Sequence, residues 1–346
     1  MKKGILLGFV PVIAWAALPA MGIEACRLAA GERITLDGSF DEPAWSRAPL
    51  LDRFWQIAPE DNIEAPVRTE ARFAYDGHSL YVAVRAHDPD MSQVRAPFAR
   101  RDNVLRDQDM IVLNVDPVGN RKFAHFFRVN PRGSVGDGLW NEDSGTEDFS
   151  PDIEFEVVTG RFPGGWTAEF RIPLSQLRYN PGEMAHTWGL QLGRKSARRA
   201  EVSFFSFTPK TESQGVNRYG HLTGLGKLAA PRRIEMVPYA LAKNANPVVA
   251  ANDPFRTKND VVLGGGLDLK VGITSNLTLD ATINPDFGQV EVDPAVVNLS
   301  AFETFFPERR PFFVEGASIF RFGAMRTQNQ SNGYTFLHSR RIGRSP

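Results

Sequence analysis

Alternating apolar and polar residues predict a β-hairpin in the first third of the chain. Between Val67 and Tyr75, apolar side chains alternate with arginine and glutamate. Asp76-Gly77-His78 is a turn sequence, and the segment from Leu80 to Ala86 alternates again. A period of two residues is typical of strands that bury one face, and an Asp-Gly pair favours a tight turn between two of them.

The same pattern predicts further short strands, separated by turns rich in glycine, proline and asparagine. They are Met110–Asp116, Phe123–Asn130, Ile153–Val158, Trp166–Ile172, Trp188–Gly193 and Glu201–Phe207. A helix is predicted to start near Asp41, with Pro43 in its first turn, and a single helical turn is predicted at Leu174–Leu177. Many short strands between turns favour an all-β fold, here an antiparallel β-sandwich over residues 30–228.

Two segments near the C-terminus have the length and period of transmembrane strands. Apolar residues alternate with polar residues or glycine from Leu263 to Ile273 and from Leu277 to Ile283, and Thr274-Ser275-Asn276 forms the turn. A strand that crosses a membrane needs about 9–11 residues with one lipid-facing side. The alternative is an ordinary hairpin of a soluble sheet. Ile234–Leu241 is either the first strand of the same unit or a connector.

The first 22 residues have the layout of a secretory signal peptide. Lys2 and Lys3 precede an apolar core at Ile5–Leu18, and Leu18-Pro19-Ala20 offers a cleavage site. This core is shorter than the roughly 20 apolar residues of a spanning helix. A lipoprotein signal ending at Cys26 is disfavoured, because Glu24 stands where a small residue is expected. We therefore expect an exported protein, located in the periplasm or at an outer membrane.

Composition excludes several other classes of protein. The 346 residues include 40 basic and 40 acidic side chains, whereas a nucleic-acid-binding protein usually has a basic excess. The single cysteine provides neither a disulfide framework nor a cysteine metal site, and the six histidines form no His-Glu-x-x-His zinc motif. The sequence also lacks a nucleophile elbow, a phosphate-binding loop and a dinucleotide-binding fingerprint.

Three blocks of the predicted sandwich resemble family 9 carbohydrate-binding modules. They are DGSFDEPAW (Asp37–Trp45), YDGHSLYVAVRAHDPD (Tyr75–Asp90) and GWTAEFRIPLSQLRY (Gly165–Tyr179), and they occur in the order of that family. The resemblance implies a β-sandwich that binds a polysaccharide or oligosaccharide without cleaving it.

A second resemblance covers the C-terminal third, residues 229–346. TLDATINPDFGQVEVDPAVVNLSAFETFFPERRPFFVEGASIF (Thr278–Phe320) resembles the signature of an uncharacterised bacterial outer-membrane family, DUF5916, as does SRRIGR (Ser339–Arg344). Members of that family usually join a family 9 module to a large β-barrel. The resemblance implies that this region supplies the first strands of such a barrel. Because a barrel requires closure, we expect the sequence to be truncated.

A saccharide site needs an aromatic face and a polar rim. Aromatic candidates away from the strand cores are Trp140, Trp55, Phe98 and Tyr179, whereas Trp45, Trp166 and Trp188 have the spacing of core residues. Trp140 is the main candidate, because it lies in a predicted polar loop with Asp137, Asn141, Glu142 and Asp143; the alternative is that it caps one end of the sandwich. Arg100, Arg101 and Asp102 either form the rim or are solvated loop charges.

Two further kinds of chemistry have candidate residues. Carboxylates that provide the oxygen ligands preferred by Ca²⁺ are Asp88, Asp90, Asp102, Asp107, Asp109 and Asp116, and modules of the resembled family often carry structural calcium. A glycosidase needs two carboxylates flanking the scissile bond, and Glu154 and Glu156 share a strand face that Glu169 or Asp152 could oppose. Polar strand faces carry carboxylates in any case, so no catalytic residue is predicted.

These features favour non-catalytic carbohydrate binding by an exported, outer-membrane-associated protein linked to glycan catabolism. One alternative is a channel or export component whose sandwich is a periplasmic adaptor. The other is a hydrolase that acts on O-glycosyl bonds.

Overall fold

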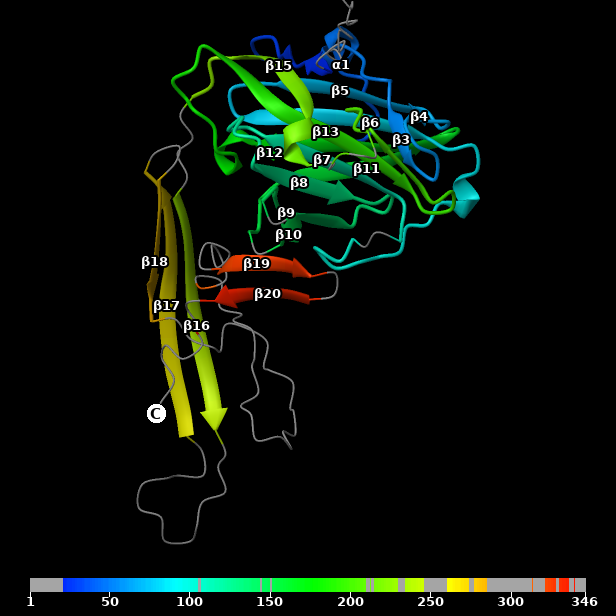
Figure 1. The fold of residues 1–346 in the computed structure, drawn as a ribbon. Helices are drawn as coiled ribbons and strands as arrows, with labels where there is room; N and C mark the ends of the chain where they lie inside the picture. Colours follow the sequence, from blue (N-terminus) through cyan, green and yellow to red (C-terminus); the bar gives the residue numbers. More distant parts are fainter. Residues whose placement is uncertain are drawn as a thin grey trace, which may run out of the picture.

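The computed structural model describes residues 21–104, 107–143, 145–149, 151–209, 212, 215–229, 234–245, 260–273, 277–284, 313, 321–327, 330–335 and 339. They form an N-terminal two-layer β-sandwich and two smaller C-terminal sheets (Figure 1). The prediction of an all-β, mainly antiparallel fold is thereby confirmed. The predicted signal peptide core and the motif residues 285–312 lie outside the described residues.

The first layer of the sandwich is a ten-stranded sheet. Eight strands follow the order β10-β9-β8-β7-β13-β14-β3-β4, with β15 beside β13 and β1 beside β15. The long strand β13 pairs with β15 through its first half and with β14 through its second half. The bounds are β1 Gly22–Glu24, β3 Trp55–Ala58, β4 Ile63–Glu64, β7 Met110–Asp116, β8 Phe123–Val129, β9 Val135–Asn141, β10 Thr146–Asp148, β13 Ala185–Ser196, β14 Glu201–Phe204 and β15 Gly220–Gly226.

The second layer is a five-stranded sheet with the order β11-β12-β6-β5-β2. It contains the predicted hairpin, whose strands pair from Thr69 opposite Ala86 to Tyr75 opposite Leu80. Asp76 closes the turn by accepting hydrogen bonds from the backbone of His78 and Ser79. The bounds are β2 Cys26–Arg27, β5 Thr69–Tyr75, β6 Ser79–His87, β11 Glu156–Phe162 and β12 Gly165–Pro173.

The main core fills the space between the two sheets. Alternate residues of β6 and β12 contribute Val82, Val84, Trp166 and Phe170, and they pack with residues of the first sheet such as Leu113. Trp45, Trp166 and Trp188 are each at most 2% exposed, which confirms their assignment to the core. Burying a large apolar side chain contributes about 1.5–3 kcal/mol, so this cluster dominates the stability of the sandwich.

A helical segment covers the outer face of the second sheet. Helix α1 (Pro43–Arg47) begins at Pro43 after the N-cap residue Glu42, whose side chain makes no capping hydrogen bond. Trp45 of this helix packs with Tyr81 and Ala83, which point away from the main core. Short 3₁₀ helices occur at η1 (Met91–Gln93), η2 (Leu174–Gln176) and η3 (Val216–Arg218), and η2 confirms the predicted helical turn.

The N-terminal segment joins both layers. β1 runs parallel to β15 of the first sheet, and β2 runs parallel to β5 of the second. The sandwich therefore begins by Gly22, before the predicted start at residue 30. Cys26 lies within β2, where it is half-buried.

The C-terminal region forms a three-stranded antiparallel sheet, β16-β17-β18, and a separate pair, β19-β20. Figure 1 shows β16–β18 as an extended arm beside the sandwich. The bounds are β16 Ile234–Ala245, β17 Asp260–Gly272, β18 Thr278–Ile283, β19 Arg321–Thr327 and β20 Gln330–Thr335. The pairing of β16 with β17 shows that Ile234–Leu241 is a strand of this unit and not a connector.

One face of the three-stranded sheet is apolar and exposed. The register aligns Met236, Leu269 and Ala281 across the three strands, and Pro238, Leu267 and Ile283 in the next row. Since directly paired residues share a face, most apolar positions of the three strands lie on one side, although Val237 shares the other face with Asp268. Asp268 and Thr282 share the opposite face, where their side chains are hydrogen-bonded. Within the described ranges, no helix combines the length and apolar character needed to cross a membrane.

Several predicted elements differ from the structure; β13, for example, extends beyond the predicted Trp188–Gly193 at both ends. The segment around Trp140 was predicted to be a loop, but Val135–Asn141 is the strand β9. The strand predicted from Ile153 begins only at Glu156, because the Ile153 backbone N–H is bonded to a side chain, that of Asp137. The strand predicted to end at Phe207 ends at Phe204.

Candidate functional site

An ion pair with a buried aspartate holds the exposed Arg101 side chain at one end of the sandwich. Arg101 Nη2 lies 2.6 Å from Asp137 Oδ1 and donates to the Ile153 carbonyl over 2.7 Å. Asp137 is 1% exposed, and its Oδ2 accepts a hydrogen bond of 2.6 Å from the Ile153 backbone N–H. The contacts lock the guanidinium between β9 and the segment that leads into β11. They also bring together the predicted residues Asp137 and Asp102, because Asp102 Oδ1 accepts from the Asp137 N–H at 3.1 Å.

Burial controls the protonation of both aspartates. Burial raises the pKa of Asp137 to about 6, an effect that the hydrogen bond from Ile153 and the charge of Arg101 only partly offset. Burial also raises the pKa of Asp102, against the lowering effect of the Asp137 N–H. The Asp137 carboxylate holds Arg101 in place. Because its pKa is raised, it takes up a proton and loses this ion pair at a higher pH than an ordinary aspartate would.

Arg101 opens onto a cavity of about 580 Å³, which we call the Arg101 pocket. The sandwich lines it with Arg101, Asp152, Ile153, Glu154, Ser175 and Gln176. Ile234 and Glu235, the first residues of β16, line it from the C-terminal sheet. Arginine, carboxylate, hydroxyl and amide groups provide both donors and acceptors of hydrogen bonds. The volume lies within the range of about 300–1,000 Å³ that small-molecule pockets occupy.

Trp140 lies apart from Asp137, although the two are three residues apart in sequence. Asp137 pairs with the core residue Phe127, whereas Trp140 pairs with Ala124, so their side chains project from opposite faces of β9. Trp140 packs on a cluster of Ala124, Val216 and Tyr219. Its Nε1 donates to Glu142 Oε2 at 3.4 Å, and the same oxygen accepts from the Val216 N–H. These contacts place Trp140 on the outer face of the first sheet, next to Val216 of η3.

Trp55 lies at the far edge of the same sheet. Its strand β3 is separated from β9 by β8, β7, β13 and β14. The half-buried indole packs edge-on against Phe207, with ring centroids 5.4 Å apart, and Arg53 stacks on it. Trp55 and Trp140 therefore do not form one aromatic platform.

The other predicted rim and aromatic residues have separate positions. Tyr179 is not an exposed candidate as expected: it is 2% exposed and packs against His186 and Trp188. Phe98 is 80% exposed and stacks with Arg132. Arg100 is exposed, and it is the next residue, Arg101, whose side chain lines the pocket.

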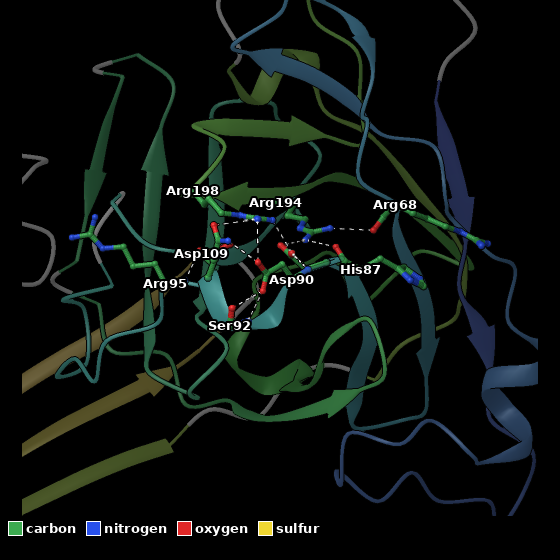
Figure 2. A network of polar contacts seen from close by, with 10 residues as sticks. Arg68, His87, Asp90, Ser92, Arg95, Asp109, Arg194 and Arg198 are labelled. Carbon is green, nitrogen blue, oxygen red and sulfur yellow. Dashed lines mark hydrogen bonds and ion pairs between the residues drawn. The ribbon is translucent and has the colours of Figure 1, made fainter.

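The carboxylates proposed as calcium ligands are held by arginines and backbone N–H groups. Asp88 Oδ1 lies 3.0 Å from Arg198 Nη2, and Asp109 Oδ2 accepts from the Arg95 N–H at 2.8 Å (Figure 2). Arg194, 3% exposed, binds the carbonyls of Arg68 and His87 in the same network. Within the described residues, no group of three or more aspartate, glutamate, histidine or cysteine side chains has metal-binding geometry.

The remaining calcium candidates also have local partners. Asp90 accepts from the Ser92 N–H. Asp107 pairs with Arg95 at 3.0 Å. Asp116 accepts from the Gly119 and Arg121 N–H groups and closes the turn after β7.

Glu169 has a structural role that its position in the sequence did not reveal. It is fully buried on β12 and accepts hydrogen bonds of 3.0 Å from the Asp37 and Gly38 N–H groups and of 3.1 Å from Trp45 Nε1. Burial raises its pKa, and these hydrogen bonds oppose the rise. Glu169 thus ties the Asp37–Trp45 block to the Gly165–Tyr179 block, two segments that are distant in the sequence.

One family comparison covers the C-terminal region. Residues 230–346 match the model of a domain of unknown function, DUF5916. The match confirms the resemblance carried by Thr278–Phe320. Comparison of the whole sequence with curated proteins gave no match.

Solved structures similar to the chain include a family 9 carbohydrate-binding module from Caldicellulosiruptor kristjanssonii. Its complex with cellotriose has 19% identity and a TM-score of 0.44, covering 59% of this chain and 94% of that one. Its complex with glucose has 19% identity and a TM-score of 0.43, covering 58% and 94%. At these values the similarity says nothing about what the present chain binds.

Four residues of the Arg101 pocket carried no signal in the sequence. Ser175 and Gln176 belong to η2, and Ile234 and Glu235 begin β16. Only the packing of β16 against the end of the sandwich brings these two pairs together, and alternation within one strand cannot predict that.

Proposed function

We propose that this protein binds a saccharide, without cleaving it, in the Arg101 pocket. The observation that carries the proposal is a concave, polar site whose central guanidinium is already fixed by Asp137 and the Ile153 carbonyl. A sugar presents many hydroxyl groups, each of which donates and accepts. Groups held in place before binding lose little conformational freedom, so their hydrogen bonds contribute more to affinity.

The pocket offers apolar contacts without an aromatic platform. Ile234, 68% exposed, lines it from the C-terminal sheet and suits the C–H surface of a pyranose ring, whereas Ile153 is 3% exposed and belongs to the main core. Asp152, Glu154 and Gln176 supply acceptors for hydroxyl groups, and Arg101 and Gln176 supply donors. The residues that would contact the sugar are therefore different from the tryptophans that the sequence predicted as sugar-binding residues.

The positions of the candidate catalytic carboxylates favour binding without hydrolysis. Glu169, one of the candidate acids, is buried beneath α1 with its oxygens engaged by three N–H groups. Glu156 is paired with Arg171 on the exposed strand β11. Neither lines the Arg101 pocket. The other two candidates, Asp152 and Glu154, do line it, but both are exposed to solvent and Asp152 pairs with Arg101.

A glycan array probed with the full chain tests this proposal. We expect binding to a defined glycan, and a loss of roughly tenfold in affinity for Gln176→Ala, since buried polar contacts to a ligand are each worth about 1–3 kcal/mol. Trp140→Ala is the matched control and should retain the affinity. Failure to bind any glycan, or a loss confined to Trp140→Ala, would contradict the proposed site. Sugar release from the bound glycan would favour the hydrolase alternative.

We also propose that the C-terminal sheet associates with the bacterial outer membrane. Its apolar face is strongly exposed, with Leu263 at 76%, Ile283 at 65% and Met236 at 60%. β16 has 12 residues and β17 has 13, more than the about 9–11 residues that cross a bilayer. The resemblance of Thr278–Phe320 to an outer-membrane family supports the same location.

Flotation of the full chain with lipid vesicles tests this association. Leu279→Arg puts a charge on the apolar face, and Thr278→Arg puts the same charge on the opposite face of the same strand. We expect Leu279→Arg to lower vesicle partition roughly tenfold, as a charge on a lipid-facing strand position costs up to about 2–4 kcal/mol. Equal effects of the two substitutions would argue against insertion by this face.

A further inference from the structure

Asp137 is the buried charge that fixes the guanidinium of Arg101. Arg101 Nη2 lies 2.6 Å from Asp137 Oδ1, and its Nε lies 3.5 Å from Asp152 Oδ1. The Asp137 side chain is 1% exposed, whereas that of Asp152 is 83% exposed, and ion pairs that involve exposed side chains contribute little. The Ile153 carbonyl and the Phe155 ring also contact the guanidinium, but neither carries a charge. Loss of the Asp137 charge therefore removes the main electrostatic anchor of Arg101.

The two carboxyl oxygens of Asp137 have different partners. Oδ2 accepts the Ile153 backbone N–H over 2.6 Å, and Oδ1 faces Arg101 Nη2. A neutral carboxyl group has one O–H donor and keeps an acceptor on its other oxygen. While Oδ2 accepts the Ile153 N–H, a proton taken up by Asp137 resides on Oδ1. That O–H then points at a guanidinium, which has donors only, so the contact with Arg101 is lost.

Few other groups near the pocket change charge in the pH range in which Asp137 does. Burial raises the pKa of Asp137 to about 6, above that of an ordinary carboxyl group. No histidine is found among the lining residues in the described part of the chain. The other charged groups around Asp137 and the pocket are Arg101, Asp152, Glu154, Glu235, and Arg128 with its partner Glu147. Burial also raises the pKa of Asp102, whose Oδ1 accepts the Asp137 N–H, so its titration must be separated from that of Asp137.

We propose that Asp137 is a positioning residue that makes saccharide binding in the Arg101 pocket depend on pH: proton uptake by Asp137 releases Arg101, and binding of a sugar returns that proton to the solvent. This inference rests on the proposed saccharide site and describes its regulation. A donor that is fixed before binding loses little conformational freedom, whereas a released arginine must be ordered again. A ligand that prefers the charged form of Asp137 lowers its proton affinity by the same factor.

The direction of the pH dependence follows from the two states of Asp137. Above about pH 7 Asp137 is charged, Arg101 is held in place and the affinity is highest. As the pH falls through about 6, the free protein takes up a proton, and a sugar that binds has to order the Arg101 side chain again. Because ordering one long side chain opposes binding, we expect the affinity to fall roughly three- to tenfold between about pH 8 and pH 5.

Calorimetric titration of the full chain with a neutral oligosaccharide measures this effect. The first probe is a trimer of glucose, followed by the neutral glycan that binds best on the array, because neither has a charge of its own that changes with pH. Titration at about pH 6 in two buffers of different ionisation enthalpy should show release of up to about half a proton per sugar bound, and none at about pH 8. Proton release is measured on the native protein, so this result does not depend on the folding of a variant.

Two substitutions assign the effect to Asp137. Asp137→Asn keeps the shape of the side chain without its charge, so it should bind with the lower affinity at about pH 5 and at about pH 8 alike. Asp102→Asn is the matched control: it removes a nearby carboxyl group with a raised pKa that does not line the pocket, and it should retain the pH dependence.

Equal affinity of the native protein at the two pH values, proton uptake on binding, or a pH dependence that persists in Asp137→Asn would overturn the inference while leaving a saccharide site in place. Absence of binding to the glucose trimer at either pH, together with a blank glycan array, would overturn the proposed saccharide function itself.

Discussion

Glu169 links two sequence blocks that lie more than a hundred residues apart. Its carboxylate receives the backbone N–H groups of the Asp37-Gly38 turn and the indole N–H of Trp45. The turn, the helix that follows it and the Ala-Glu pair of β12 therefore form one structural unit. The sheet tolerates this fully buried carboxylate on its outer face because three N–H groups donate hydrogen bonds to it.

Glu169→Gln should lower the free energy of unfolding by about 1–3 kcal/mol. The amide group of glutamine brings two N–H donors into a site where three donors already converge, so at least one is left without an acceptor. Urea denaturation of the full chain measures the change. Glu156→Gln, which removes an exposed carboxylate paired with Arg171, is the control and should change stability by less than about 1 kcal/mol. Similar losses for both variants would refute the role assigned to Glu169.

Asp137 should make stability depend on pH in a defined direction. Its pKa in the folded protein is about 6, above the ordinary value of 3.8 that applies to the unfolded chain. As the pH falls from 6 towards 4, the folded protein binds a proton that the unfolded chain does not, so this group stabilises the fold at low pH and the gain is lost as pH rises through 6. Relative to Asp137→Asn, the native protein should gain about 2 kcal/mol over that interval.

Denaturation of both proteins across this pH range measures the difference. Asp152→Asn, which changes an exposed carboxylate that also pairs with Arg101, is the control and should show no such pH-dependent difference. A constant gap between native protein and Asp137→Asn would show that the Asp137 carboxyl group titrates normally.

At the scale of elements, the alternation of apolar and polar residues was sufficient to predict strands that have one buried and one polar face. The pair β5–β6 follows its predicted hairpin, and β7 has the predicted bounds. β9 was missed because Asp137 points inward at a position where an apolar residue is expected, and Arg101 and Ile153 compensate its burial. Such compensation comes from segments distant in the sequence, so no local pattern reveals it.

The candidate site was predictable only in part for the same reason. Asp102 and Asp137 were both predicted site residues, and the structure brings them together: the Asp137 N–H donates to Asp102, and the Asp137 carboxylate pairs with Arg101. Trp55 and Trp140 lie at opposite edges of the first sheet, because β8, β7, β13 and β14 pair between their strands. The order of strands depends on pairing between segments that are distant in the sequence. The aromatic residues of the sequence alone therefore could not show that Trp55 and Trp140 lie far apart.

The pairing of β9 with its neighbours depends on Gly138. Its φ is +155°, and an added Cβ would lie 2.7 Å from Phe126 Cζ and overlap the Asp148 carbonyl. Gly138→Ala should therefore cost about 1–3 kcal/mol of stability, as overpacking of a filled site does. Gly77→Ala, where no atom lies within 4 Å of the added Cβ, is the control and should be within about 0.5 kcal/mol of the native protein. Equal melting temperatures for the two variants would contradict this packing.

At the scale of the whole molecule, the Arg101 pocket joins two regions with different surfaces. Ile234 and Glu235 belong to a sheet whose one face is apolar, whereas Asp152, Glu154 and Gln176 belong to the closed sandwich. A saccharide held there would contact both regions. In the proposed function the sandwich captures a ligand and the C-terminal sheet attaches to a membrane, whereas a periplasmic adaptor would require no ligand.

Hydrogen–deuterium exchange of the full chain, with and without its best-binding glycan, shows directly whether a saccharide occupies the Arg101 pocket. Bound ligand should slow exchange in the backbone around Asp152–Glu154, Ser175–Gln176 and Ile234–Glu235, because it covers the Arg101 pocket and limits local opening. The segments around Trp55 and Trp140 should be unaffected. Protection confined to β9 near Trp140, or to β3 near Trp55, would contradict the account and return the saccharide site to the tryptophans.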